Sequence, residues 1–332
     1  MHLSKSMLTI FLAVFTLASC KDQAEELVAK DDTKKSSAKV VASYWDTNSP
    51  AIPWARGINN QPSYIGKNRT NYDEIAQLGY NIIRIEYDPS KYYDYSSDMA
   101  WQDVVKVVSS TNMNVILTWH NRDYFNGDKT NWNGPIDAYE QFWKYIIPRI
   151  NALPSSQSGR IIINILNEWG PSDNQAYNWG TWNQNAITKM RAIGYGGRII
   201  VDAGLYGNRL TVFYNGHQYI TDNGVIFGVH TYQDGIDQAT IDRLDNIRLP
   251  NGRRRHFILG EFGVKYFKYT PGKPQLTPQQ KEQDKNKVRG LASYARSKGW
   301  GVLGWCWEGD GEGMNMKTDL EYRSYINDCL WR

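Results

Sequence analysis

Eight short apolar runs, separated by segments with helical periodicity, restrict the fold of this chain more than any other feature of its sequence. Short runs rich in Ile and Val are typical of strands that are covered on both faces. They lie at 54–59, 81–87, 114–120, 161–168, 198–204, 225–230, 257–263 and 301–307. Helical periodicity is clear at 98–110 and 138–150, and Thr277-Pro278-Gln279-Gln280 predicts a capping box that begins a helix reaching Ser297.

Strands that alternate with helices predict an α/β fold, specifically a (β/α)8 TIM barrel. We expect it to form a single domain over residues 46–332, a normal length for such a barrel. The weakest part of the pattern is 205–220, where no clear helix shows. A doubly wound sheet is the alternative, but no GxGxxG phosphate-binding turn follows the first run.

The first 45 residues predict export rather than folding. Lys5 precedes an apolar run from Met7 to Leu17 that is too short for a permanent membrane span, so residues 1–19 are expected to be a signal peptide. Leu17-Ala18-Ser19-Cys20 resembles a bacterial lipobox, which implies cleavage before Cys20 and lipidation of Cys20. An ordinary signal peptide that contains a Cys is the alternative.

Residues 20–45 are expected to be a flexible tether, because 21–40 hold five Lys and five acidic residues among small polar ones. Together these features predict a protein anchored by lipid to the bacterial outer membrane, on its periplasmic or cell-surface side.

The distribution of charge argues against a nucleic-acid partner. The net charge is only +4, and the basic residues are dispersed apart from Arg253-Arg254-Arg255, which we expect to form a solvated loop. Cys306 and Cys329 are too few for a disulfide scaffold. Side chains alternate along a strand, so Cys306 should point toward the last helix, which holds Cys329. We therefore predict that the two sulfurs approach each other and can form a disulfide, with two separately buried thiols as the alternative. We expect a monomer.

The aromatic content points to a polar, flat ligand. The chain has 13 Trp and 22 Tyr, and many of them, including Trp169 and Trp307, stand in Gly- and Asn-rich stretches. Aromatic faces of this kind are suited to stacking on a pyranose ring, although several could simply brace long loops.

Polar or aromatic groups follow most of the predicted strands. In a barrel these strand ends meet on one face, where the active site lies. In chain order they are Arg84, His120, Asn167, Glu168, His230, Tyr232, Glu261 and Trp305. Two carboxylates on this face, Glu168 and Glu261, suggest glycoside hydrolysis, which needs one protonated and one ionised carboxyl group. No HExxH motif is present and Cys is scarce, so we expect no metal and no cofactor.

Five motifs in order carry a family resemblance: RGIN at 56–59, INxxNEW at 163–169, HTY at 230–232, LGEFG at 259–263 and GWCWEGDG at 304–311. From about Pro53 onward the chain resembles glycoside hydrolase family 5, whose members are retaining (β/α)8 glycosidases. The resemblance implies that Glu168 is the general acid/base and Glu261 the nucleophile.

The resemblance also implies roles for the other candidates. Asn167 would contact the sugar 2-hydroxyl, Arg84 and Tyr232 would hold the nucleophile ionised and aligned, and His120 and His230 would border subsite −1. Trp305 would form the floor of this subsite. Trp169 is expected to lean toward a neighbouring subsite, and Trp307 is a further candidate for substrate binding.

The motifs NEW, GEFG and the WxW of the last strand resemble bacterial endo-β-1,4-mannanases most closely. Asn60-Gln61-Pro62-Ser63-Tyr64 departs from that pattern, and VILTWH at 115–120 is more similar to the cellulases of the family. Long loops after the third, fourth and eighth strands favour a cleft for an extended polymer. We therefore expect a retaining endo-β-1,4-glycanase for a plant-type polysaccharide, with β-mannan as substrate. A cellulase and a non-catalytic glycan-binding lipoprotein are the alternatives.

Overall fold

The computed structural model describes residues 50–65, 70–91, 95–121, 124, 133–170, 175–249, 251–269, 271–273, 275–309 and 312–332. The expected signal peptide at 1–19, the lipidation site Cys20 and the tether at 20–45 lie outside the described residues. Within the described part of the chain, no helix is long and apolar enough to cross a membrane.

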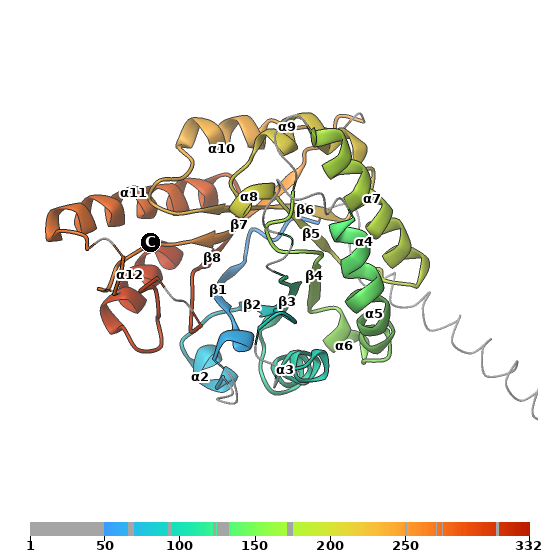
Figure 1. Ribbon diagram of the computed structural model, residues 1–332, viewed down its shortest axis with the longest axis horizontal. Coiled ribbons are helices and arrows are strands. Elements are labelled where there is room, and N and C mark those ends of the chain that lie inside the picture. Colours follow the sequence, from blue (N-terminus) through green and yellow to red (C-terminus); the bar gives the residue numbers. More distant parts are fainter. Residues whose placement is uncertain are drawn as a thin grey trace, which may run out of the picture. The chain divides into compact units, whose positions relative to one another are not determined.

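Eight parallel strands form a closed barrel in chain order, which confirms the predicted TIM-barrel fold (Figure 1). The strands are β1 (Arg56–Asn60), β2 (Ile82–Tyr87), β3 (Asn114–Trp119), β4 (Ile161–Asn164), β5 (Ile199–Asp202), β6 (Val225–Thr231), β7 (His256–Phe262) and β8 (Gly301–Gly304). The barrel closes where β8 pairs with β1, for example Leu303 with Gly57.

Helices surround the barrel (Figure 1). They are α2 (Tyr72–Gln77), α3 (Ser97–Ser110), α4 (Gly134–Ala138), α5 (Lys144–Asn151), α6 (Ser155–Ser158), α7 (Ala176–Ala192), α8 (Gly204–Gly207), α9 (Thr211–Gly216), α10 (Gln238–Asp245), α11 (Pro278–Ser297) and α12 (Leu320–Trp331). A π-helical turn, η3 (Tyr139–Trp143), joins α4 to α5, and the 3-10 turns η1 (Pro62–Tyr64) and η5 (His217–Tyr219) complete the set. The capping box predicted at Thr277 and Gln280 is present.

The segment 205–220 holds only short helical pieces, as its weak pattern suggested. Within α8, Leu205 and Tyr206 have left-handed backbone angles, with φ of 48° and 61°. A regular helix cannot pass through these residues, which explains why no helical periodicity appears there.

A layer of aliphatic side chains fills the barrel interior below the strand ends. Side chains two residues apart on a strand face the same side, so each of the strands β2 to β8 contributes one member, and two more come from the segment before β1. The members are Ile52, Ala55, Ile82, Ile116, Ile162, Ile200, Ile226, Ile258 and Leu303. The next inward positions carry Arg84, Thr118, Asn164 and Asp202, all buried. The barrel interior therefore changes from apolar to polar within one layer, just below the strand ends.

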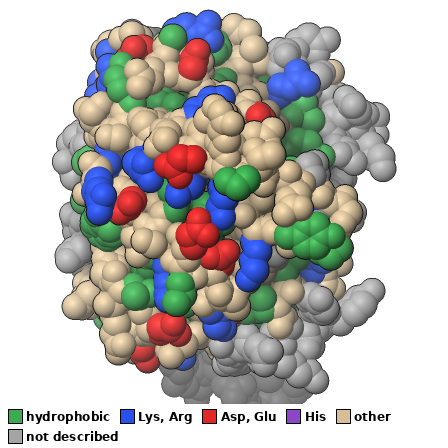
Figure 2. All heavy atoms as spheres, turned by 90° about the vertical axis from the view of Figure 1, so that its left-hand side faces the viewer, with side chains coloured by type: hydrophobic (Ala, Val, Ile, Leu, Met, Phe, Trp, Pro, Cys, Tyr) green, Lys and Arg blue, Asp and Glu red, His purple; other side chains and the backbone are tan. Residues whose placement is uncertain are grey.

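The arginine triplet lies in the segment before β7, as expected, but its last member is buried rather than solvated. Arg255 is only 2% exposed and donates to the carbonyl oxygens of His217 and Ile220. Arg254 pairs with Asp245. On the face shown in Figure 2, basic and acidic side chains are interspersed, an arrangement unlike the single-sign surface used for nucleic acids.

Cys306 and Cys329 are both free and buried, so the disulfide considered from the sequence is not formed. Strand β8 ends at Gly304, and the alternation used to aim Cys306 at the last helix does not extend to it. Its Sγ lies 3.6 Å from the carbonyl oxygen of Glu308 instead. The alternative of two separately buried thiols is the one observed.

We predict opposite effects for two Gly→Ala changes. A Cβ at Gly228 on β6 would lie 2.0 Å from Asp202 Oδ1, whereas a Cβ at Gly290 on α11 would meet nothing within 4 Å. Gly228→Ala should lower the free energy of unfolding by roughly 1–3 kcal/mol through overpacking. Gly290→Ala should raise it by about 0.5–1 kcal/mol through helix propensity. Urea unfolding of both variants checks this, and equal midpoints would contradict the packing described here.

Candidate active site

At the carboxyl ends of the strands the barrel opens into a cleft of about 660 Å³. The structure brings six of the ten candidate residues to its lining: His120, Asn167, Glu168, Tyr232, Glu261 and Trp305. Arg84 and His230 are buried directly beneath them, in contact with the two carboxylates. Trp169 and Trp307 are not brought to the cleft.

An unusual backbone conformation places Glu168 in the cleft. Glu168 has a φ of 52°, in the left-handed region that residues other than glycine rarely adopt. Its N–H donates to Asp202 Oδ2 at 3.3 Å, and the preceding N–H of Asn167 donates to the carbonyl oxygen of Trp119 at 2.9 Å. The turn lets the consecutive side chains of Asn167 and Glu168 both line the cleft, which simple alternation along a strand would forbid.

A bulge in β7 places Glu261 in the same cleft. Val229 pairs with Leu259 but His230 pairs with Glu261, so β7 contains one extra residue at this point. Leu259 and Phe262 both belong to the core between strands and helices, although two residues separate them. Because a slip of one residue reverses the direction of every following side chain, the bulge turns Glu261 inward.

The two carboxylates lie close together with His230 beneath them. One carboxylate oxygen of Glu168, one of Glu261 and a ring nitrogen of His230 all lie within 4.8 Å of one another. His230 Nδ1 is 2.8 Å from Glu168 Oε1 and 3.2 Å from Glu261 Oε1. The carboxylates are therefore closer than the roughly 6.5–9.5 Å of inverting glycosidases and match the retaining arrangement.

Arg84 and Tyr232 hold Glu261 by hydrogen bonds. Arg84 Nη1 donates to Glu261 Oε1 and the Tyr232 hydroxyl donates to Oε2, each at 2.8 Å. The other nitrogens of Arg84 donate to Asn164 Oδ1, at 3.1 and 2.8 Å, and to Asp202 Oδ2 at 3.4 Å. Glu261 is thus oriented by two donors that are themselves fixed by the polar layer of the barrel.

Burial and neighbouring charges set the protonation of this group. Burial raises the pKa of Glu261 to about 7, with Glu168 and Glu86 adding to the effect and His230 and Arg84 opposing it. Burial opposes the charge of His230, but the carboxylates of Glu261, Asp202 and Glu168 outweigh it and raise the pKa of His230 to about 9. His230 is therefore a cation near neutral pH.

The same three side chains are the metal-ligand group found among the described residues. A metal ion there would have to replace the hydrogen bond between His230 Nδ1 and Glu168. It would also compete with the donors of Arg84 and Tyr232 on Glu261. The hydrogen bonding fits a proton-transfer site better than a metal site.

Trp169 and Trp307 pack inside the protein. A Cβ at Gly134 would lie 2.4 Å from Trp169 Nε1, so this indole lies flush against the start of α4. Trp307 is fully buried, and its backbone N–H donates to the carbonyl oxygen of Asn59. Both indoles belong to the core between strands and helices.

Several cleft residues were missed from the sequence. Gln61 and Tyr64 line the cleft from the segment after β1, and Tyr206 lines it from α8. Glu86 and Asp202 are buried beneath it. Side-chain alternation along the strands could have identified Glu86 and Asp202 from the sequence. Glu86 lies two positions after Arg84 on β2, and Asp202 lies two positions after Ile200 on β5, so each faces the barrel interior.

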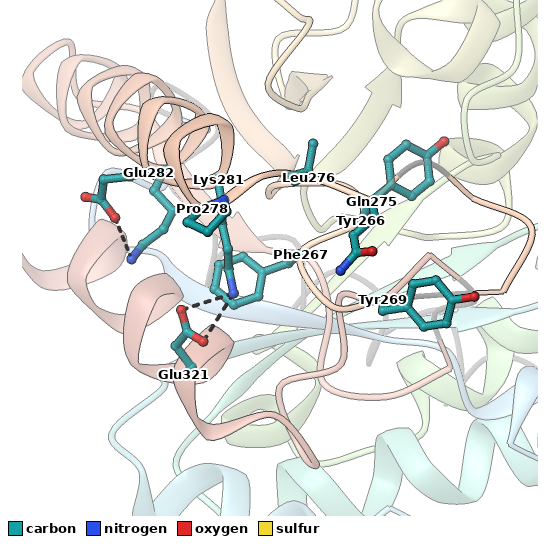
Figure 3. A pocket seen from close by; sticks show the side chains of 10 residues that line it. Tyr266, Phe267, Tyr269, Gln275, Leu276, Pro278, Lys281, Glu282 and Glu321 are labelled. Atoms are coloured by element: carbon teal, nitrogen blue, oxygen red, sulfur yellow. Dashed lines mark hydrogen bonds and ion pairs between the residues drawn. The ribbon is translucent and has the colours of Figure 1, made fainter.

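A second hollow of about 410 Å³ lies between the segment after β7 and helices α11 and α12 (Figure 3). Tyr266, Tyr269 and Gln275 line one side of it. Its charged groups pair with one another, Lys281 with Glu321 at 3.1 Å and Lys285 with Glu282 at 3.0 Å. The described residues that line it include no histidine and no buried carboxylate, so the chemistry belongs to the first cleft.

Comparison with known proteins identifies the family. The model of the cellulase family, glycosyl hydrolase family 5, matches residues 44–311. The chain belongs to glycosyl hydrolase family 5. The resemblance read from its motifs is therefore confirmed, and the strand-end carboxylates occur in a family of glycoside hydrolases.

The relatives of this family 5 chain include mannanases and cellulases. A mannan endo-1,4-beta-mannosidase of Streptomyces lividans is 23% identical over 281 residues, which are 82% of this chain and 64% of that relative. One from Cellvibrio japonicus is 22% identical and is covered over 56% of its length, so the chain spans less than two thirds of either. The β-mannanase from Thermomonospora fusca has a similar fold, with a TM-score of 0.59, 20% identity, and coverage of 79% of this chain and 81% of that one.

We predict that Tyr232→Phe moves the acidic limb of the kcat/KM profile to higher pH. Glu261 must be ionised to attack, so kcat/KM should fall as pH drops through its raised pKa of about 7. Loss of the Tyr232 donor destabilises the ionised form and raises this pKa further. We expect kcat/KM to fall roughly 10- to 100-fold, the value of one hydrogen bond to a charged group.

Tyr294→Phe is the matched control. Its hydroxyl also donates to a carboxylate, Asp242 Oδ1 at 2.8 Å, but it lies on α11 outside the cleft. This variant should keep the wild-type pH profile. Equal profiles for Tyr232→Phe and the wild type would show that the Tyr232 hydroxyl does not act on Glu261.

Proposed function

We propose that this chain is a retaining endo-β-1,4-glycanase that hydrolyses β-mannan. The observation that carries the proposal is the pair of carboxylates, Glu168 and Glu261, within 4.8 Å in a cleft with His230 beneath both. A protein that only binds glycans would need aromatic platforms but neither carboxylate, so this alternative leaves the pair and its donors without a role.

In the proposed reaction Glu261 attacks the anomeric carbon while Glu168 transfers its proton to the leaving glycosidic oxygen. The bond from the anomeric carbon to that oxygen breaks, and a covalent bond to a Glu261 oxygen forms. Glu168 then takes a proton from water, whose oxygen displaces Glu261 and restores the original anomeric configuration. Arg84 and Tyr232 stabilise Glu261 as the leaving carboxylate.

The identity of the polysaccharide that is hydrolysed is the more specific part of the proposal. β-Mannan is supported by the NEW, GEFG and WxW motifs and by the two mannan-degrading relatives. A β-1,4-glucan is the second candidate, because VILTWH at the end of β3 is similar to cellulases and delivers His120 to the cleft. Endo action is proposed from the long loops after the third, fourth and eighth strands.

We further propose export with a lipid anchor at Cys20. The support is the order of Lys5, an apolar run and Leu17-Ala18-Ser19-Cys20, followed by a charged, apolar-poor segment. Cys20→Ala should release the protein from the outer-membrane fraction. Equal membrane recovery of the variant and the wild type would exclude the anchor.

A substrate panel tests the reaction. We expect release of reducing ends from soluble mannan above that from carboxymethyl cellulose and xylan, with a rapid fall in viscosity because cleavage is internal. Preference for carboxymethyl cellulose would select the glucanase alternative. Binding without release from any of the three would favour the non-catalytic alternative.

We predict different failures for Glu168→Gln and Glu261→Gln. Both changes are isosteric and should leave the fold intact, which circular dichroism checks. Glu261→Gln should abolish turnover because no glycosyl-enzyme can form. Glu168→Gln should retain activity on aryl glycosides whose leaving group needs no proton, and azide should accelerate its deglycosylation with retention. A glycosyl azide of retained configuration from Glu261→Gln, with azide inert on Glu168→Gln, would reverse the two roles.

A further inference from the structure

A third carboxylate, Glu86, is completely buried below the cleft and contacts three side chains of the site. It lies on β2, two residues after Arg84, and has no exposed surface. Its Oε1 accepts from Arg84 Nη1, and its Oε2 accepts from Gln61 Nε2 at 2.9 Å. The same Oε2 is 2.7 Å from His120 Nδ1. Gln61 and His120 line the cleft, whereas Glu86 does not.

These contacts fix one proton of His120. Burial disfavours the charge of Glu86, but Arg84 and His120 outweigh it and lower the pKa of Glu86 to about 2. An ionised carboxylate can only accept hydrogen bonds, so the short contact requires a proton on His120 Nδ1.

The opposite side of the ring fixes the second proton. His120 Nε2 lies 3.4 Å from the hydroxyl oxygen of Tyr64, and that hydroxyl donates its single proton to Asp88 Oδ2 at 2.7 Å. The Tyr64 oxygen is then an acceptor toward the ring, so the contact is favourable only if Nε2 also carries a proton. Asp88 accepts from Ser90 as well, from its N–H at 2.9 Å and its hydroxyl at 2.6 Å.

We propose that Glu86 is a positioning residue of this site. Its carboxylate stabilises His120 as a cation in the cleft wall. It also orients the guanidinium of Arg84, which donates a hydrogen bond to Glu261. The proposal rests on the hydrolytic function proposed above. Glu86 itself touches no substrate, since it is covered by the groups that it orients.

The electrostatic surroundings of His120 agree with this role. Burial lowers its pKa, but Glu86, Asp88 and Glu168 outweigh burial and raise it above the ordinary value. Arg84 is the cation on the same strand as Glu86, Asp88 directly follows that strand, and Tyr64 faces the ring from η1. Both ring N–H groups of His120 are then donors, one to Glu86 and one toward Tyr64, so the ring itself offers no acceptor to a sugar hydroxyl.

Glu86→Gln tests the proposal because it keeps the shape and removes the charge. Without Glu86, His120 should lose its second proton at lower pH, and Glu261 should ionise at lower pH because a like charge has gone. Both limbs of the kcat/KM profile should therefore move to more acidic pH. We expect a loss of roughly 10- to 100-fold at neutral pH, the range for removing a group that orients catalytic ligands, and a smaller loss in acid.

Asp103→Asn is the matched control. Asp103 is also a buried carboxylate with a short hydrogen bond, from the Tyr95 hydroxyl at 2.7 Å, but it lies on α3. This variant should lower the thermal midpoint and leave the shape of the pH profile unchanged. If Glu86→Gln likewise scaled the whole profile without shifting it, the role of Glu86 would be structural only and the proposal would be overturned.

A second measurement needs no turnover and no Glu86 variant. Nitrogen-15 NMR of the histidine rings, with the His120 signals assigned by their loss in His120→Gln, reports protonation directly. Wild-type His120 should keep both ring protons at neutral pH, and a neutral His120 ring there would overturn the proposal. If the wild type hydrolyses no glycan, the proposed function fails while this titration still decides whether Glu86 holds a charged His120.

Discussion

The buried guanidinium of Arg84 is the interaction on which the architecture of the site depends. A charged group that is buried away from water lowers the free energy of unfolding by several kcal/mol unless opposite charges and hydrogen bonds compensate it. Arg84 is 2% exposed and forms ion pairs with Glu86, Asp202 and Glu261, which come from β2, β5 and β7. These carboxylates raise its pKa despite burial, so Arg84 remains charged. Arg84 thereby links β2, β5 and β7, which are not adjacent in the barrel, by ion pairs near the carboxyl ends of the strands.

Charge balance around this unit limits which of its carboxylates can bind a proton. Four buried carboxylates, those of Glu86, Glu168, Asp202 and Glu261, surround the cations of Arg84 and His230. If His120 is the third cation, as proposed, these carboxylates and the buried Asp88 that acts on His120 outnumber the cations, so the cluster favours a bound proton. Glu86 has a strongly lowered pKa, so it does not take that proton. Burial raises the pKa of Glu261 to about 7, so Glu261 binds a proton in acid and must lose it before it can attack.

The regular parts of the structure followed from the sequence, and the irregular parts did not. Alternation and run length predicted eight strands, and polar residues at the ends of the runs predicted the residues that meet at the cleft. The assignment failed where the backbone leaves its regular geometry. Glu168 adopts a left-handed conformation, and Trp169 beside it packs in the core. Gly260 stands at the bulge that turns Glu261 inward, and a glycine within a strand is a bulge signal that was not used. Glu86 was missed for a different reason, because an ionisable residue inside an apolar run was not read as part of the site.

The division between strands and loops also explains why the reaction is better defined than the substrate. Glu168, Glu261 and their partners are held at strand ends by the barrel, whereas Lys91, Tyr206 and Lys265 reach the cleft rim from connecting segments. Loops vary while the scaffold that carries the chemistry persists. Sequence motifs at the strand ends therefore specify bond cleavage, and discrimination between mannan and glucan depends on rim residues whose segments have no regular pattern to read.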